Sequence, residues 1–297
     1  MNDRHWRGYA ALIAAIAGIA WSAIFIRWAA VPGTSSAFYR VFIASLVLVP
    51  WRLATLRGPS DRLKAQSSAS RRSVVLALAG GVFFGLDLAL YNSAVMRTAA
   101  TVATLLGNNS PIFVGLGSWL VFGRRPGRRF WGGLVLALSG SATVMMANVG
   151  THGTAGGAAV GNVMALGAAF FFAGYLLLTE RVREEMDTLT FSSLAIVGSV
   201  VTLLVTCLVA GAPLGGFSGR TWLALLGLGL ISQLGAYLGL AYALGHLPVT
   251  ITSVSLLAQV PLTALLAVPL LGEQLSVSYV VGGMLVLTGI YIVTAKR

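Results

Sequence analysis

Residues 94–111 read AVMRTAATVATLLGNNSP, and residues 243–261 read ALGHLPVTITSVSLLAQVP. Each stretch holds small and β-branched residues, then a leucine pair, and ends on a proline two residues after an amide side chain. The copies are offset by about 150 residues in a chain of 297. Self-similarity at a fixed period predicts an internal repeat. The sequence therefore predicts two related halves, residues 1–150 and 151–297, with no soluble domain.

The likeness between the copies continues to residues 145 and 294 and includes two matched positions in this longer stretch. Pro111 corresponds to Pro261, and Gly140 corresponds to Gly289. A residue that ends or bends a helix, and a residue that lets helices approach closely, therefore recur at an offset of about 150, with a slip of one residue. These matches indicate a duplicated helical unit.

The composition identifies the environment of the chain. Hydrophobic residues make up 57% of the sequence and charged residues 9%, and the mean hydropathy is +0.86. Ordinary soluble domains are about 25% charged. The values exclude a soluble globular enzyme, a disordered chain and a disulfide scaffold, and predict a polytopic membrane protein. Cys207 is the single cysteine, which excludes an intrachain disulfide and a zinc site built on paired cysteines.

Ten apolar runs are long enough to span a bilayer, since a spanning helix needs about 20 apolar residues. We expect an all-α integral membrane protein with these ten transmembrane helices: Tyr9–Trp28, Ser36–Leu56, Ser73–Val95, Thr98–Phe122, Phe130–Asn148, Ala158–Thr179, Leu189–Gly211, Thr221–Ala243, Pro248–Leu271 and Val277–Ala295. The first run is as long as a span, so we expect it to stay in the protein rather than be cleaved as a signal peptide.

The basic residues predict the orientation. The net charge of +12 comes from residues in short loops between apolar runs, so nucleic-acid binding is not expected. Sixteen of the twenty lysines and arginines fall at one side if the N-terminus is cytoplasmic. Cytoplasmic loops carry an excess of Lys and Arg. Both termini are therefore predicted to be cytoplasmic, and the remaining four basic residues lie outside or within spans: Arg27, Arg40, Arg97 and Arg220.

The repeat also predicts a functional class. A unit of five helices crosses the membrane an odd number of times, so its second copy is inserted upside down. Inverted repeats are typical of secondary transporters, in which substrate binds near the midplane and the halves move to alternate access. The expected fold is ten helices in two inverted five-helix repeats, functional as a monomer within the lipid bilayer.

Several segments together resemble a known family. They are WSAIF at 21–25, FYR at 38–40, and the two proline-centred helices described above. The chain resembles the EamA-type drug/metabolite transporters, and is most similar to their YddG-type branch. The resemblance implies a ten-helix bundle with a central cavity that exports aromatic and other neutral amino acids across the bacterial inner membrane.

Asp87 is the clearest candidate site residue, because ionisable groups at membrane depth are costly. Tyr91 lies four residues later, on the same helix face. Asp87 could accept a substrate ammonium or carry a proton. The alternative is an interhelical hydrogen bond in which the acid is neutral or paired.

The two proline-centred helices supply further candidates. Asn108 and Asn109 precede Pro111, and Gln259 precedes Pro261 by two residues. Proline cannot donate a backbone hydrogen bond, so each helix frees a carbonyl near mid-span. Kinks that expose carbonyls beside amide side chains suit the wall of a polar cavity. The alternative is a packing kink, but the matched positions favour the cavity.

Five more residues complete the expected substrate site. Gln233 and Tyr237 are predicted on the eighth span, at positions similar to Asp87 and Tyr91, and three aromatic side chains would suit an apolar substrate: Trp21, Phe172 and Tyr175. In this hypothesis Asp87 or the freed carbonyls meet the ammonium, and amides meet the carboxylate. Arg40 could attract a carboxylate or extend to the interface, and we expect a structural role for it.

Motifs for other chemistry are absent from the sequence. It has no Walker A loop, no H-E-x-x-H and no G-x-S-x-G, and its three histidines are scattered. We therefore expect neither an enzyme nor a bound cofactor or metal. The alternatives are an exporter of drugs or other metabolites and an intramembrane enzyme. Proton coupling stays open.

Overall fold

A computed structural model describes residues 3–55, 70–95, 97, 100–146, 158–271 and 277–295. Within these residues the chain is helical and has no strand. The helices are α1 (Asp3–Ala20), α2 (Ser22–Ala29), α3 (Gly33–Thr55), α5 (Arg71–Val95), α6 (Ala100–Gly107), α7 (Ser110–Phe122), α8 (Arg128–Met146), α9 (Ala158–Arg183), α10 (Thr188–Ala210), α11 (Gly219–Gly227), the π-helix η1 (Leu228–Gly235), α12 (Ala236–Leu244), α13 (Val249–Ser255), the 3₁₀ turn η2 (Leu256–Ala258), α14 (Gln259–Leu271) and α15 (Val277–Thr294).

Helices of membrane-spanning length make up the bundle. In the described part of the chain, eight helices or runs of joined helices are long and apolar enough to cross a membrane. Their outer faces are apolar: Val209 is 84% exposed and Met284 66% exposed. Exposing so much apolar surface to water is unfavourable, whereas the hydrocarbon of a lipid bilayer is itself apolar and can contact it. The prediction of an all-helical, multi-pass membrane protein is confirmed.

Two of the ten predicted spans are not in that set. The predicted fourth span is divided into α6 and α7, and the predicted fifth span corresponds to α8. Thr98 and Asn148, which were predicted to begin and end these spans, lie outside the described residues, as does the predicted boundary between residues 150 and 151. The ten-span count therefore stays a prediction.

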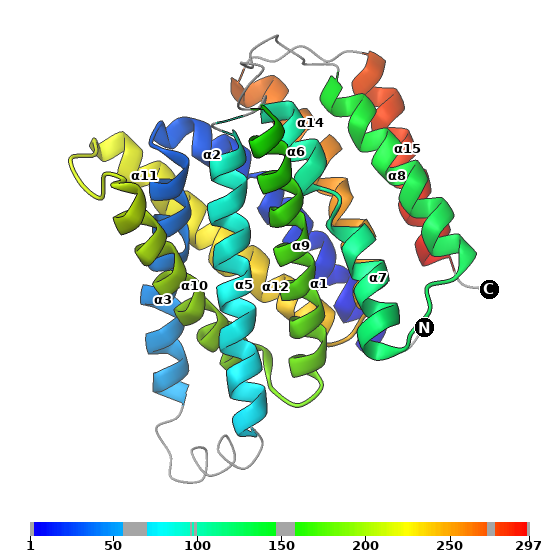
Figure 1. The fold of residues 1–297 in the computed structure, drawn as a ribbon, viewed down its shortest axis with the longest axis horizontal. Helices are drawn as coiled ribbons and strands as arrows, with labels where there is room; N and C mark the ends of the chain where they lie inside the picture. The colour runs from blue at the N-terminus through cyan, green and yellow to red at the C-terminus, as the bar shows by residue number, and fades with distance from the viewer. Residues whose placement is uncertain are drawn as a thin grey trace.

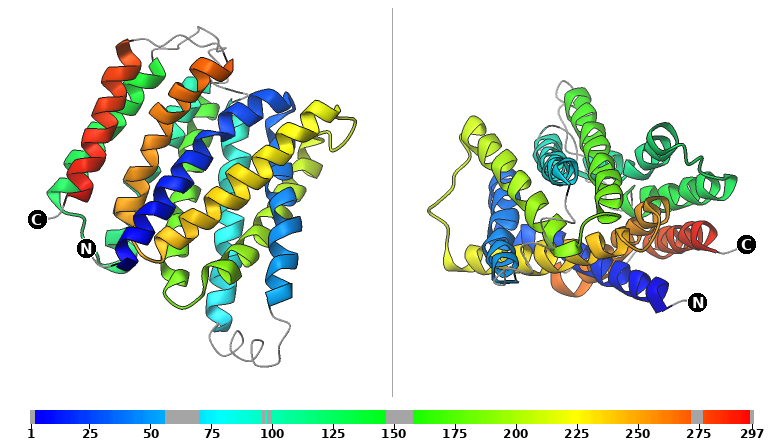
Figure 2. Two further views of the ribbon diagram at one scale, coloured as in Figure 1. Left: turned by 180° about the vertical axis from the view of Figure 1, so that it is seen from behind. Right: turned by 90° about the horizontal axis from the view of Figure 1, so that it is seen from below.

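The chain is arranged so that α1 begins and α15 ends at the same end of the bundle (Figures 1 and 2). Side-chain contacts join other segments at this end. Arg52 of α3 donates to Thr190 of α10 at 2.8 Å, and Arg129 of α8 donates to the Ala295 carbonyl at 3.5 Å. We call this the basic end, because it holds the described loop arginines that the charge pattern assigned to one side.

Asp187 anchors the start of α10 at the basic end. Its carboxylate accepts the Thr190 backbone N–H at 3.0 Å, as an N-cap does. Partial burial opposes ionisation of this carboxyl, but hydrogen bonds from Thr190 and the charge of Arg52 outweigh burial and lower its pKa. The cap is therefore charged at neutral pH, and its contribution to stability is lost only as the pH falls through this lowered pKa.

A close helix crossing joins α8 and α15, which lie side by side at one edge of the bundle (Figures 1 and 2). A Cβ added at Gly140 would lie 2.5 Å from the Gly282 carbonyl oxygen, and one added at Gly133 would lie 2.6 Å from that of Gly289. Real Cβ atoms do not approach so closely, so only glycine permits these backbones to touch.

Replacing Gly140 with leucine tests this crossing. The larger side chain would push α15 away from α8. We expect the free energy of unfolding to fall by about 1–3 kcal/mol or more, because the neighbouring backbone cannot move aside as a side chain can. Gly132→Leu is the matched control, since Gly132 is exposed on the same helix with no heavy atom within 4 Å of an added Cβ. The measurement is the melting temperature of purified protein in detergent. Equal melting temperatures for the two variants would contradict the crossing.

Candidate substrate cavity

One interrupted helix is formed by α6 and α7, which are separated by Asn108 and Asn109. The Asn109 Nδ2 donates to the Leu105 carbonyl at 2.8 Å, which satisfies a carbonyl at the end of α6. Pro111 lies in the first turn of α7, where its missing N–H costs nothing. The break therefore falls just before the proline, not at it.

A second interruption lies between α13 and α14. The chain passes through the 3₁₀ turn η2, and α14 begins at Gln259, two residues before Pro261. The geometry parallels that of the first interruption, where α7 begins directly after Asn109. Each proline thus sits in the first turn of a helix that follows a break, at positions that the sequence repeat matches.

The π-helix η1 was not predicted. It spans Leu228–Gly235 and continues directly into α12. π-Helical turns are rare and frequently occur at functional sites. Here Gln233 of η1 and Tyr237 of α12 both reach Arg40 of α3: the Arg40 Nε–H donates to Gln233 Oε1 at 2.9 Å, and the guanidinium carbon lies 5.6 Å from the Tyr237 ring centroid.

A cavity of about 660 Å³ lies where the interrupted helices meet. Six residues predicted from the sequence line it: Asp87, Tyr91, Asn108, Phe172, Tyr237 and Gln259. The breaks themselves contribute Gly107 and Leu257. Non-helical backbone at membrane depth is tolerated where it lines such a space.

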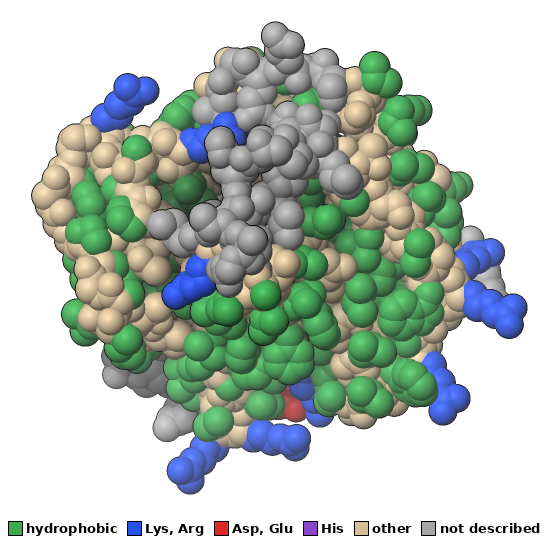
Figure 3. Space-filling model, turned by 45° about the horizontal axis from the view of Figure 1, so that its top comes forward, with side chains coloured by type: hydrophobic (Ala, Val, Ile, Leu, Met, Phe, Trp, Pro, Cys, Tyr) green, Lys and Arg blue, Asp and Glu red, His purple; other side chains and the backbone are tan. Residues whose placement is uncertain are grey.

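The wall of this cavity extends to the end of the bundle opposite the basic end. Arg27 of α2, Met145 of α8 and Ala267 of α14 line it, and each lies near the last turn of its helix. Figure 3, which brings this end forward, shows hydrophobic side chains over much of the surface and basic side chains mainly toward its edges.

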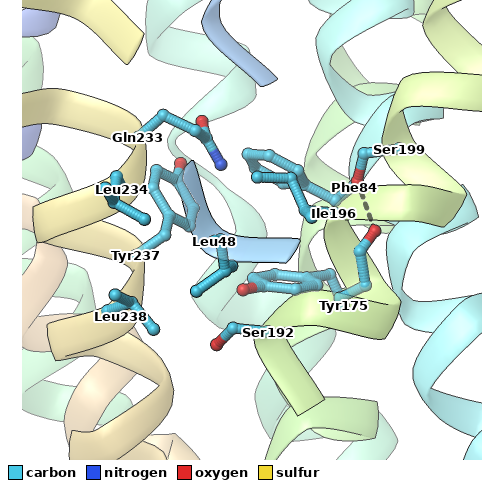
Figure 4. A pocket seen from close by; sticks show the side chains of 11 residues that line it. Leu48, Phe84, Tyr175, Ser192, Ile196, Ser199, Gln233, Leu234, Tyr237 and Leu238 are labelled. Atoms are coloured by element: carbon cyan, nitrogen blue, oxygen red, sulfur yellow. Dashed lines mark hydrogen bonds between the residues drawn. The ribbon is translucent and has the colours of Figure 1, made fainter. Parts of the chain in front are cut away.

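Aromatic side chains separate the cavity from the basic end. Phe84 packs against Tyr237 and Tyr175, with ring centroids 4.7 and 5.0 Å apart. These rings surround a second, much smaller cavity of about 30 Å³, drawn in Figure 4. Tyr237 lines both cavities, so its ring forms part of the partition between them.

Beyond the aromatic side chains the basic end is tightly packed. Leu244, Leu247 and Val249 are at most 3% exposed. The Glu180 carboxylate accepts the Val249 N–H at 2.9 Å at the start of α13 and pairs with Arg124 at 3.3 Å. The contacts tie α9 to α13 and to the loop after α7, so the structure is closed at this end.

The other predicted site residues lie elsewhere. Tyr175 and Gln233 line the small cavity rather than the large one. Trp21 lies at the turn between α1 and α2, and its ring centroid is 5.7 Å from that of Phe25. The side-chain amide of Asn109 donates to backbone carbonyls of α6. Neither residue lines the large or the small cavity, and a role in binding stays a prediction for both.

Arg40 is the residue that sequence reasoning undervalued. It does not extend to the interface: it is 6% exposed and lines the large cavity. Its position two turns into an apolar helix, after FY in the FYR segment, was the available signal. Small polar residues on the wall were also missed, because hydroxyls are common in membrane helices: Ser22, Thr104, Ser110, Ser253 and Thr263.

Comparison with known proteins settles the family. The profile of the EamA-like transporter family matches residues 6–146 and again residues 159–295. The chain belongs to this family. Membership of this family indicates that the protein is a membrane transporter, and the apolar helices and the cavity are consistent with that function.

Two relatives support the same assignment. An uncharacterized transporter of Archaeoglobus fulgidus is 30% identical over 264 residues, which cover 88% of this chain and 87% of the relative. The uncharacterized transporter YwfM of Bacillus subtilis is 31% identical over 209 residues, covering 69% of this chain and 68% of the relative. A solved crystal structure has the same fold, with a TM-score of 0.78, 20% identity, and coverage of 97% and 96% of the two chains.

The asymmetry of the cavity can be measured with introduced cysteines. In a Cys207→Ala background, Ala264→Cys on the large cavity should react readily with a small polar thiol reagent added to purified protein. Ala195→Cys is the matched control, because Ala195 borders the small cavity and is 6% exposed. We expect labelling several-fold slower there. Equal labelling rates would show that the structure does not close at the basic end.

Proposed function

We propose that this EamA-family transporter exports aromatic and other neutral amino acids across the bacterial inner membrane by alternating access. The observation that best supports this proposal is the cavity of about 660 Å³ between two interrupted helices. The cavity extends to the end of the bundle opposite the basic end, and the basic end is tightly packed. Small-molecule sites typically occupy about 300–1,000 Å³. The names of the relatives specify no cargo, so the amino-acid cargo and the YddG-type branch rest on sequence resemblance and on the chemistry of the wall.

The proposed architecture is ten transmembrane helices in two inverted repeats. Its best support is the crossing of α8 and α15, where Gly133 contacts Gly289 and Gly140 contacts Gly282. Residue numbers rise along one helix as they fall along the other, so the helices are antiparallel. Adding 149 converts Gly133 to Gly282 and Gly140 to Gly289, so exchanging the halves reproduces the same pair of contacts. An inverted repeat requires this relation.

Other helix pairs obey the same exchange. In the first half, α5 packs against α9 and α10 of the second half. In the second half, α12 packs against α1, and η1 packs against α3. Because the third helix of one half contacts the first two helices of the other in both directions, the pairs support a twofold relation. The two profile matches also support halves of residues 1–150 and 151–297.

The orientation is part of the proposal. The basic end carries the arginines at the ends of α3 and α9 and at the starts of α5 and α8, and cytoplasmic loops prefer such charge. With this end in the cytoplasm, both termini are cytoplasmic and the large cavity faces outward. The structure then represents the state that releases an exported substrate.

The chemistry of the wall suits an amphipathic amino acid. Asp87 can accept a substrate ammonium, and Phe172, Tyr91 and Tyr237 provide aromatic surface for a side chain. The family and relatives point to a transporter rather than an enzyme. One chain encloses this cavity, which supports function as a monomer.

Counterflow in liposomes tests the proposal. Purified protein is reconstituted in vesicles loaded with unlabelled phenylalanine or leucine, and uptake of the labelled amino acid is followed with and without a pH gradient. We expect saturable exchange, and acceleration by the gradient would reveal proton coupling. Absence of exchange for a full amino-acid panel, with folded protein, would contradict amino-acid export and direct the test to drugs and other metabolites.

Asp87→Asn should reduce amino-acid exchange by about tenfold or more, because a hydrogen bond to a charged group contributes about 1.5–3 kcal/mol. Asp187→Asn is the matched control: it makes the same chemical change at a helix cap outside the cavity, and asparagine caps as well as aspartate. Exchange rates are compared at equal protein content and melting temperature. Wild-type exchange by Asp87→Asn would remove Asp87 from the site.

A further inference from the structure

The large cavity contains a buried cation whose hydrogen bonding is incomplete. Arg40 is 6% exposed and lines the cavity, with its Nε bound to Gln233 and its guanidinium beside the Tyr237 ring. Among the described residues, Arg40 Nη2 is buried and has no hydrogen-bond partner. Burying a charged donor without an acceptor is expensive, so a structure retains one where a ligand supplies the acceptor.

Asp87 is not that acceptor in this structure. Its carboxylate shares the cavity, yet no ion pair joins it to Arg40 in the part of the chain that is described. The two side chains therefore line one cavity without a direct ion pair between them. The other charged side chain there is Arg27, which is exposed near the end of α2.

Two more residues of the cavity wall, near the interrupted helices, carry a buried donor. Ser22 Oγ, at the start of α2, and Asn108 Nδ2, at the break between α6 and α7, are buried without a hydrogen-bond partner among the described residues. Both residues line the large cavity with Arg40. A guanidinium, an amide N–H and a hydroxyl can each donate a hydrogen bond to a carboxylate.

We propose that Arg40 is the carboxylate-binding residue of this cavity and that Asp87 binds the ammonium, so the cargo is a zwitterionic α-amino acid rather than an amine or a cationic drug. This inference rests on the proposed transport function and names its substrate class. Gln233 and Tyr237 are positioning residues, because they hold the guanidinium and leave Nη2 for the ligand. The positive charge of Arg40 repels a cargo that has only an ammonium.

Three ligands with one phenyl side chain separate the two charges. Phenylalanine carries both, phenethylamine lacks the carboxylate, and 3-phenylpropionate lacks the ammonium. In counterflow of labelled phenylalanine by the wild-type protein, we expect unlabelled phenylalanine to compete about tenfold or more better than phenethylamine. Equal competition by the two would overturn the proposal.

Variants of Arg40 carry the decisive comparison. Arg40→Gln should lose the preference for phenylalanine over phenethylamine. Arg40→Lys should keep part of it, since lysine retains the positive charge but lacks the planar guanidinium that binds a carboxylate through two hydrogen bonds. Arg220→Gln is the matched control, because Arg220 is exposed and is not among the residues that line the cavity. An unchanged preference in folded Arg40→Gln would overturn the assignment. If that variant fails to fold, Gln233→Glu serves instead: its carboxylate should occupy Arg40 and weaken phenylalanine competition.

Ligand-induced thermal stabilisation separates this inference from the transport function. We expect 3-phenylpropionate to raise the melting temperature of the wild-type protein but not of Arg40→Gln. That result without any amino-acid exchange would support the carboxylate site and contradict amino-acid export. Exchange of phenylalanine with the same stabilisation in both proteins would contradict the Arg40 site and leave export standing.

Discussion

Hydrocarbon offers no hydrogen-bond partner to a peptide group, and this constraint organises the whole molecule. It makes each long apolar segment helical, and it allows a helix to be interrupted only where protein or a cavity satisfies the freed groups. The interruptions before Pro111 and Pro261 both border the large cavity, as this constraint requires of non-helical backbone at membrane depth. The same rule explains why Asn109 turns its amide back onto the Leu105 carbonyl instead of toward a ligand.

Features that depend on local pattern could be predicted from the sequence. Apolar length located most helices, and the recurrence of an amide before a proline located the two breaks, because proline chemistry acts within one helical turn. The wall residue Asp87 followed from the cost of ionisable groups at membrane depth, and Gln259 from its position before Pro261. Trp21 was predicted as aromatic surface and Asn109 as an amide beside Pro111. Here Trp21 packs on Phe25, and Asn109 donates to a backbone carbonyl.

Features that depend on contacts between distant segments could not be predicted. The π-helix η1 has no periodic signature, and it brings Gln233 to Arg40 across 193 positions of sequence. Without that contact, an arginine two turns into a helix could still extend its side chain to the interface, which is the cheaper location. The glycines at the α8–α15 crossing were visible in the sequence, but which of them meet was set by the antiparallel arrangement of the helices. The contact with Gln233 therefore holds Arg40, whose location the sequence leaves open, at the wall of the cavity.

The central claim is that one cavity, formed where the interrupted helices meet, holds a zwitterion between Arg40 and Asp87. The most direct measurement is a crystal structure with 4-bromophenylalanine, in which anomalous scattering locates the bromine and the density orients the ligand. The account predicts one molecule in the large cavity, with its carboxylate within hydrogen-bond distance of Arg40 Nη2 and its ammonium facing Asp87. A ligand bound elsewhere, or one with its carboxylate directed away from Arg40, would contradict it.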